Sequence, residues 1–146
     1  MFVSVTRLRV RSLRYVLSFF WRNFLAKRQV VRAPGFIGGR LLVDVRLTFW
    51  TLTVWESEKA MKAFRGSDAH APVMPLLARW CDEASYAHWH STSAEVPTWL
   101  EAYEHLQAEG RVSRVEHPAP EHEARRFRAP RLSPLIGQSL APVRRS

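Results

Sequence analysis

The sequence contains a single cysteine, Cys81, so it cannot form an internal disulfide bond. No second cysteine stands near it in a C-x-x-C pattern, which argues against a metal site built from thiolates. We expect Cys81 to be a small buried hydrophobic side chain and not a nucleophile. A protein without disulfides is typical of a reducing compartment, and we expect it to be cytoplasmic.

Long apolar runs are also missing. The longest one near the N-terminus, residues 15–21, has seven residues including a serine, and Arg22 and Asn23 end it. A run of this length is far too short to span a bilayer, and no small-x-small cleavage site follows it. We therefore expect no membrane span and no signal peptide, and we interpret the segment as part of a folded, soluble domain.

Acidic residues are scarce at both ends of the chain. The net charge is +9, and residues 1–46 hold ten basic residues and one acidic residue. Such a balance can indicate a nucleic-acid surface. However, Arg7, Arg9 and Arg11 alternate with apolar residues, as on the solvent face of a strand, and no RNP, zinc-finger or helix-turn-helix pattern occurs. We expect nucleic acid not to be a partner, although the basic ends leave it as a third hypothesis.

The first half of the chain predicts a strand, a helix and two more strands. Residues 2–10 are β-branched and partly alternating, which favours a strand. Ser12 can cap a helix whose predicted inner face is an apolar stripe at helical spacing: Leu13, Val16, Leu17, Phe20 and Phe24. Strands are predicted at about 36–44 and 47–55, with Gly38 and Gly39 indicating a bulge or a close backbone approach.

The second half predicts helices separated by a fourth strand. Ser57 can cap a helix that ends at Gly66, and a second short helix can start at Ser67. His70 shares its apolar stripe with Val73, Met74, Leu77 and Trp80. A strand at residues 84–92, a helix at 97–110 and a short strand at 111–117 follow.

The order of these elements predicts an α+β fold, the ferredoxin-like split βαβ arrangement with one antiparallel sheet and an extra C-terminal helix. Helices would cover one face of the sheet, and the many Trp and Phe residues on the middle strands would leave an apolar second face. A second copy of the chain would bury that face, so we expect a homodimer. Residues 1–117 are predicted to form the domain. Residues 118–146, rich in Pro and Arg, are predicted to be an extended tail, either mobile or wrapped across a neighbouring subunit.

The stretch GFIGGRLLVDVRLTFWTLTVWESEKAMKAFRGSDAHAPVMPLLARWCDEASYAHW resembles the antibiotic-biosynthesis-monooxygenase-like superfamily of dimeric α+β barrels. The motifs that carry the resemblance are a strand ending in Trp55-Glu56-Ser57, a helix with Ala60-Met61-Lys62-Ala63-Phe64, and His70 a few residues further on. Within this superfamily, the sequence looks closer to the branch near spheroidene monooxygenase and related uncharacterised bacterial proteins. The resemblance implies a pocket between sheet and helices and a monooxygenase-like reaction on a hydrophobic small molecule.

In the haem-handling relatives, a helix-borne histidine placed much as His70 is here binds the iron, so the resemblance implies His70 as a catalytic and cofactor-binding residue with haem as the cofactor. Met74 and Leu77 would then line the macrocycle, and Arg40 or Arg46 could pair with a propionate. The alternative is structural: His70 would cap its helix and pack in the core.

Cofactor-free relatives use Asn, Trp and Arg around an aromatic substrate. Asn23 is the only asparagine in the chain, and the predicted stripe places it off the inner face of its helix. This placement argues against cofactor-free chemistry. The predicted pocket residues are Phe49, Trp55, Phe64, His70, Met74 and Trp89.

Two further hypotheses remain open. His88 and His90 lie two apart on one strand face, but no third ligand is evident and we expect no metal site. The fold can also serve a non-catalytic protein that binds a small molecule or a partner, because a fold alone does not establish an activity. No P-loop, dinucleotide-binding glycine motif, nucleophile elbow or HExxH motif occurs.

Overall fold

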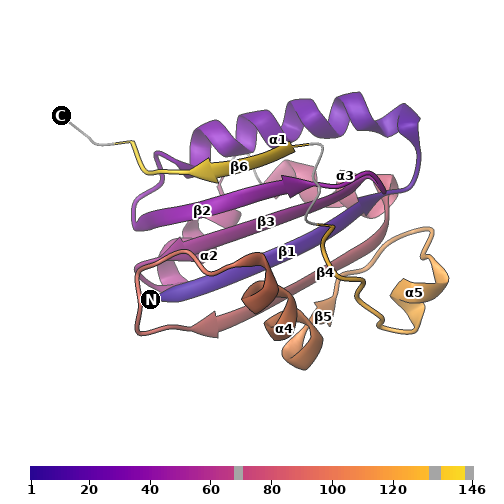
Figure 1. Cartoon of the computed structure of the whole chain (residues 1–146). Coiled ribbons are helices and arrows are strands. Elements are labelled where there is room, and N and C mark those ends of the chain that lie inside the picture. The colour runs from indigo at the N-terminus through magenta and orange to yellow at the C-terminus, as the bar shows by residue number, and fades with distance from the viewer. Residues whose placement is uncertain (68–70, 132–135, 144–146) are drawn as a thin grey trace.

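The computed structural model describes residues 1–67, 71–131 and 136–143. Within these residues, six antiparallel strands form one sheet in the order β5-β4-β1-β3-β2-β6 (Figure 1). Their bounds are β1 Phe2–Val10, β2 Phe36–Val43, β3 Thr48–Trp55, β4 Cys81–His90, β5 Arg111–Val112 and β6 Ile136–Leu140.

In the described part of the chain, five α-helices connect or flank these strands: α1 Val16–Val30, α2 Glu58–Arg65, α3 Met74–Trp80, α4 Trp99–Glu109 and α5 Pro120–Glu123. A 3-10 turn precedes α1 and another precedes α3. The predicted cap Ser57 accepts a hydrogen bond from the Ala60 amide (3.2 Å). Thr98 and Glu101 form a reciprocal capping box at the start of α4.

The predicted ferredoxin-like fold is confirmed. The first four strands alternate with helices as β1-α1-β2-β3-α2/α3-β4 and lie in the spatial order β4-β1-β3-β2. The predicted strands 36–44 and 47–55 are confirmed within one residue. The predicted irregularity at Gly38 is also confirmed, because the β2–β3 register shifts between Phe36 and Gly38.

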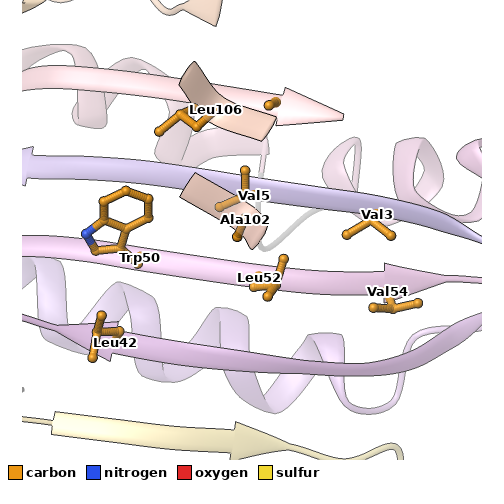
Figure 2. Close-up of a cluster of buried hydrophobic side chains, with 9 residues drawn as sticks. Val3, Val5, Leu42, Trp50, Leu52, Val54, Ala102 and Leu106 are labelled. Atoms are coloured by element: carbon orange, nitrogen blue, oxygen red, sulfur yellow. The ribbon is translucent and has the colours of Figure 1, made fainter. Parts of the chain in front are cut away.

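The face of the sheet opposite α1–α3 carries the largest apolar cluster (Figure 2). Val3, Val5, Leu52 and Val54 are fully buried there, beneath Leu106 and the other inner residues of α4. This corrects the premise of the predicted dimer, since the chain's own α4 already covers the apolar sheet face that a second copy was expected to hide. The homodimer itself stays a prediction.

The predicted inner stripe of α1 is confirmed for Val16 and Phe20, which pack against an apolar cluster of the sheet, and wrong for its other three residues. Leu13, Leu17 and Phe24 are exposed, whereas Phe19 and Val30 are buried against the sheet. The reason is that α1 has large apolar residues around most of its circumference, so helical spacing alone does not select one face.

The C-terminal segment differs from the predicted tail. β6 pairs antiparallel with β2 and extends the sheet of its own chain, and the Val143 amide donates to the Val31 carbonyl (2.8 Å). α5 lies against β4, with the Ala119 amide donating to the Asp82 carbonyl (2.9 Å). Pairing with the β2 edge satisfies backbone groups that would otherwise face water. β4 also begins at Cys81, three residues earlier than predicted.

Candidate functional site

A cavity of about 470 Å³ lies between the sheet and helices α1, α2 and α3. The family resemblance implies a pocket in this position. Strands β1, β3 and β4 form its floor, and the inner sides of α1, α2 and α3 form its roof. The volume falls within the range of small-molecule sites, which is about 300–1,000 Å³.

The floor of the cavity is polar, although it is the helix-facing side of a central sheet. The register of β3, β1 and β4 places Thr53, Ser4 and His88 in one row across the sheet. Thr51, Thr6 and Tyr86 form the next row, and all six residues line the cavity.

Apolar clusters lie at both ends of this polar band. One contains Phe49, Cys81 and Ala84, and the other contains Phe2, Trp55 and Met61. A sheet face that only packed against helices would be apolar throughout, because burying hydroxyl groups without partners is costly. The polar band therefore marks a place where the sheet meets something other than helix side chains.

The roof of the cavity includes Asn23 of α1. Phe19, Asn23 and Val30 recur at helical spacing on the inner side of α1, and all three line the cavity. This corrects the prediction that Asn23 lies off the inner face of its helix. Its amide makes no hydrogen bond to any residue that the structure describes, so both its donor and its acceptor are free for a ligand.

Trp55 forms the apolar end of the cavity wall. It is only 1% exposed, and its ring packs against Phe36 and Phe64, each with a centroid distance of 5.4 Å. Its indole N–H is buried and has no acceptor within residues 1–67, 71–131 and 136–143. Most buried N–H groups are paired, so this donor is a candidate contact for a bound molecule.

The electrostatic character of the cavity is one-sided. Four basic side chains line it, and none of the described lining residues is Asp or Glu; the four are Arg22, Lys27, Arg65 and Arg114. Burial lowers the pKa of His88, and the positive charge of Arg65 lowers it further. The lowered pKa favours the neutral form of His88, so the positive charge of the described lining comes from the four basic side chains.

Three of the predicted pocket residues line the cavity: Trp55, Phe64 and Met74. Their role in binding a substrate stays a prediction. His70, the predicted catalytic and haem-binding residue, lies outside the described residues. Leu77, expected beside Met74, also lines the cavity.

Phe49 and Trp89 lie elsewhere. Phe49 packs between Phe19 and Phe20, with centroid distances of 4.3 and 5.2 Å, in the apolar cluster at one end of the polar band. Trp89 lies on the opposite side of the sheet and stacks on His105 of α4 at 3.9 Å. Strand alternation explains this, since neighbouring residues of a strand point to opposite faces and His88 points into the cavity.

Two predicted anion-binding arginines also lie away from this cavity. Arg40 is on β2 and is not among the lining residues. Arg46 lines a different, open cavity near α5. The basic residues at the candidate site come instead from α1, α2 and the segment after β5. These segments are far apart in the chain, so the sequence does not show that they meet at one cavity.

Cys81 is fully buried, and burial raises the pKa of its thiol to about 12. This agrees with the prediction of a small hydrophobic side chain. Within the described part of the chain, no three His, Cys, Asp or Glu residues are grouped in a way that could hold a metal ion. None of the described helices is long and apolar enough to cross a membrane.

The residues that sequence reasoning missed are Asn23, Tyr86 and the four hydroxyl residues of the floor. One signal in the sequence could have found part of this set. Thr51 and Thr53 alternate with Trp50, Leu52 and Val54 in a strand whose position is central in the sheet. A central strand of this sheet has helices over both of its faces. Polar side chains at every second position of such a strand therefore indicate a cavity and not exposure to solvent.

Comparison with known proteins agrees with this fold. Residues 18–75 match the model of the antibiotic biosynthesis monooxygenase family. A protein of the antibiotic biosynthesis monooxygenase type from Nitrosomonas europaea is similar in structure, with a TM-score of 0.57 at 16% identity over 64% of this chain and 100% of that one. A second protein of this type, from Deinococcus radiodurans, has a TM-score of 0.56 at 12% identity over 67% of this chain and 99% of that one.

A third similar structure is a variant of SnoaB, a cofactor-independent oxygenase from Streptomyces nogalater. Its TM-score is 0.52 at 15% identity, and the match covers 66% of this chain and 97% of that one. A comparison with curated protein sequences gave no match. The predicted resemblance to the antibiotic biosynthesis monooxygenase family is thus confirmed, and the structural likenesses show the fold. The narrower placement near spheroidene monooxygenase is not confirmed.

Proposed function

We propose that this protein is a monooxygenase-type enzyme that binds a flat, hydrophobic molecule with a negative charge in the cavity between the sheet and α1–α3. The observation that carries the proposal is the buried indole N–H of Trp55, which has no acceptor among the described residues, in a side chain that lines the cavity. A ligand oxygen placed beside it would complete its hydrogen bond.

The charge of the ligand follows from the lining residues. Arg22, Lys27, Arg65 and Arg114 contribute positive charge, and no described acidic side chain of the lining offsets it. The apolar walls, which include Trp55, Phe64 and Leu77, favour a planar aromatic body. A phenolate, an enolate or a carboxylate on an aromatic ring system has both properties.

Asn23, Trp55 and an arginine are the residue types that the family resemblance associates with cofactor-free oxygenation, and all three line the cavity. In such a reaction, an activated methylene group of the substrate and one O₂ give a carbonyl group and one water molecule. The substrate supplies all the electrons. The amide of Asn23 and the N–H of Trp55 would stabilise the enolate oxygen, which has to form before O₂ reacts. The similarity to SnoaB, a cofactor-independent oxygenase, supports this candidate at the level of the fold.

Haem is the second candidate ligand, because it is flat, hydrophobic and doubly negative at its propionates. Arg22 and Arg65 would pair with the propionates, and Met74 and Leu77 would contact the ring. The predicted iron ligand remains His70. Haem would supply oxygen activation at its iron.

Binding is tested with two probes of the same shape, anthraquinone-2-carboxylate and its uncharged carboxamide. By isothermal titration calorimetry, we expect the carboxylate to bind about tenfold more tightly, as two weak ion pairs at the rim would provide. Trp55→Phe should weaken binding about tenfold by removing one donor. The matched control is Trp99→Phe, on the opposite side of the sheet. Equal affinity for the two probes would contradict the proposed charge preference.

Turnover is tested with anthrone. Oxidation to anthraquinone consumes one O₂, and one atom of ¹⁸O₂ should appear in the product. Loss of this activity in Asn23→Ala and Trp55→Phe with binding retained in part would support cofactor-free chemistry. A Soret band after addition of haemin that His70→Ala abolishes would favour haem instead. Tight probe binding without either result would indicate a non-catalytic binding protein.

A further inference from the structure

The outer side of α1 presents large apolar side chains to solvent. Leu17 is 83% exposed, Trp21 61%, Phe24 48% and Leu25 36%. Leu17, Trp21 and Leu25 follow one another at intervals of four residues, so they form a continuous row along the helix, with Phe24 beside Trp21. The rings of Trp21 and Phe24 stack with a centroid distance of 6.0 Å. We call these four residues the α1 patch.

Basic residues surround the α1 patch. Arg14 lies one turn before Leu17 on the same side, and Arg28 lies one turn after Phe24, with its guanidinium 5.9 Å from the Phe24 ring. Arg22 and Lys27 flank the row. α1 contains no acidic residue, and Asp44 is the single acidic residue among residues 1–46. Glu56 lines an open cavity together with Leu25 and Arg28, so one acidic side chain lies near the end of the patch, and the rest of its described rim is basic.

We propose that the α1 patch binds the surface of a membrane that contains anionic lipids. A helix that lies in the interface presents Trp, Phe and Leu to the acyl boundary and Lys or Arg to the headgroups, and the outer side of α1 combines both features. Trp is enriched at this depth of a bilayer because its ring is apolar and its N–H is polar. Each basic residue near an anionic surface adds to the attraction.

A second copy of the chain fits the α1 patch less well. A symmetric contact between two α1 helices would bring Arg14, Arg22 and Arg28 of one chain close to the same residues of the other. Like charges at such an interface oppose association. A lipid surface instead provides both the apolar layer and the negative charge.

The position of α1 gives this binding mode a consequence for the candidate site. α1 lies across the outside of the sheet (Figure 1), and its inner residues Phe19, Asn23 and Val30 line the cavity. A bilayer against the patch would place the cavity about one helix diameter, roughly 10 Å, from the lipid. The patch and its test do not depend on what the cavity binds.

The experiment is co-sedimentation of the full chain with large unilamellar vesicles, made of phosphatidylcholine alone or with 30% phosphatidylglycerol. We expect binding to the anionic vesicles to be at least about tenfold stronger and to weaken at 0.5 M salt. The triple variant Leu17→Gln, Trp21→Gln and Leu25→Gln should reduce the partition coefficient at least about tenfold. The matched control is Leu100→Gln with Val45→Gln, which removes exposed apolar side chains elsewhere and should bind as the wild type does.

Fluorescence gives an independent measurement. Trp21 is the most exposed of the described tryptophans, so its emission should shift to shorter wavelength with anionic vesicles, and the shift should disappear in Trp21→Phe. Equal binding of the triple variant and the wild type would overturn the proposal, as would no binding to either vesicle type. A concentration-dependent dimer in light scattering that the triple variant abolishes would also overturn it, in favour of a second copy of the chain.

Discussion

The ring of Phe64 on α2 packs against the ring of Trp55 at the end of β3, with a centroid distance of 5.4 Å and an interplanar angle of 31°. Both residues line the cavity, so this contact joins the second helix to the wall of the candidate site. Helix α2 has a short apolar face, on which Met61 is buried beside Phe64. The contact thus serves both the stability of the fold and the shape of the cavity.

Phe64→Ala should lower the free energy of unfolding by about 1–2 kcal/mol, since a half-buried ring is removed. It should also weaken binding of anthraquinone-2-carboxylate, because Trp55 loses the ring that fixes its position. Phe20→Ala is the matched control: Phe20 is also half-buried and packs against Phe49, but it does not line the cavity. Denaturant unfolding should show a loss of stability in both variants. Calorimetry should show a loss of binding in Phe64→Ala alone.

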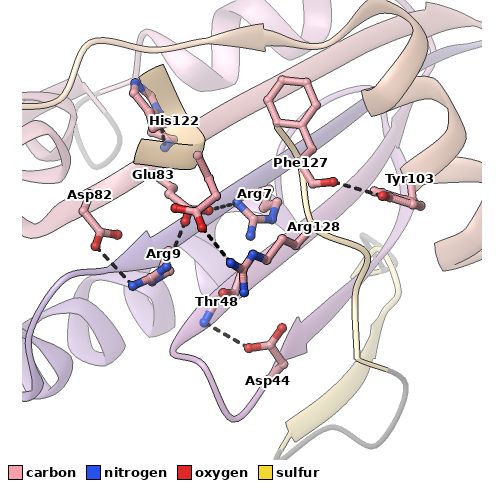
Figure 3. Close-up of polar contacts among 12 residues, drawn as sticks. Arg7, Arg9, Asp44, Thr48, Asp82, Glu83, Tyr103, His122, Phe127 and Arg128 are labelled. Carbon is pink, nitrogen blue, oxygen red and sulfur yellow. Dashed lines mark hydrogen bonds and ion pairs between the residues drawn. The ribbon is translucent and has the colours of Figure 1, made fainter. Parts of the chain in front are cut away.

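The buried ion pair of Arg7 and Glu83 connects β1 and β4 on the side of the sheet that α4 covers (Figure 3). Arg9 donates to the other oxygen of Glu83 at 2.9 Å. Glu83→Gln should destabilise the protein by about 3–5 kcal/mol, because it leaves a buried guanidinium without its counter-charge. Urea unfolding measures this loss.

Removing both charges should cost much less. The double variant Arg7→Met with Glu83→Leu should unfold within about 1–2 kcal/mol of the wild type, since no buried charge is left unpaired and the partly exposed Arg9 keeps its pair with Asp82 at 3.5 Å. Lys62→Gln, which breaks an exposed pair with Glu58, should leave stability nearly unchanged because solvent screens that pair. A double variant as unstable as Glu83→Gln would show that the pair itself, and not the unpaired charge, determines stability.

Gly39 lies on β2 beside the backbone of β3. A Cβ atom at this position would be 2.4 Å from the Leu52 carbonyl oxygen, a distance that the backbone must relieve by moving. Gly39→Ala should therefore lower the free energy of unfolding by about 1–3 kcal/mol. At Gly66, an added Cβ would be 3.5 Å from its nearest contact. Gly66→Ala should leave the thermal midpoint nearly unchanged, and equal losses in both variants would contradict the steric explanation.

His88 should make the stability of the protein depend on pH. Burial, and next the charge of Arg65, lower the pKa of His88 in the folded state below its usual value of 6.5. Below pH 6.5 the unfolded chain then binds a proton at His88 more readily than the folded chain does, so stability falls as the pH decreases. The fall from this group ends once the pH is below its folded pKa.

His88→Gln should reduce this loss of stability between pH 7 and pH 5, measured by urea unfolding at each pH. His90→Gln, at the exposed end of the same strand, is the matched control and should keep the contribution of His88. A steeper loss of stability in His88→Gln than in the wild type would show that the charged form of His88 is favoured in the fold.

Local patterns in the sequence predicted much of the sheet. Alternation and turn residues located β2 and β3, and Gly38 and Gly39 marked the irregular part of β2. These features could be predicted because strand formation and backbone irregularity depend mainly on residues that are close together in the chain. The aromatic part of the cavity wall was partly predicted, through Trp55 and Phe64. Asn23 was assigned to the wrong side of α1, and Tyr86 was not considered.

The sequence by itself determined the order of the elements, their approximate bounds and the family resemblance. The tertiary structure alone decided which side of α1 faces the sheet, that α4 covers the second sheet face, and that β6 pairs with β2 nearly a hundred residues away in the chain. The physical reason is that strand alternation and helix caps are local, whereas the choice among several apolar faces depends on the total area that all elements bury together. The cavity and the exposed α1 patch both follow from that choice.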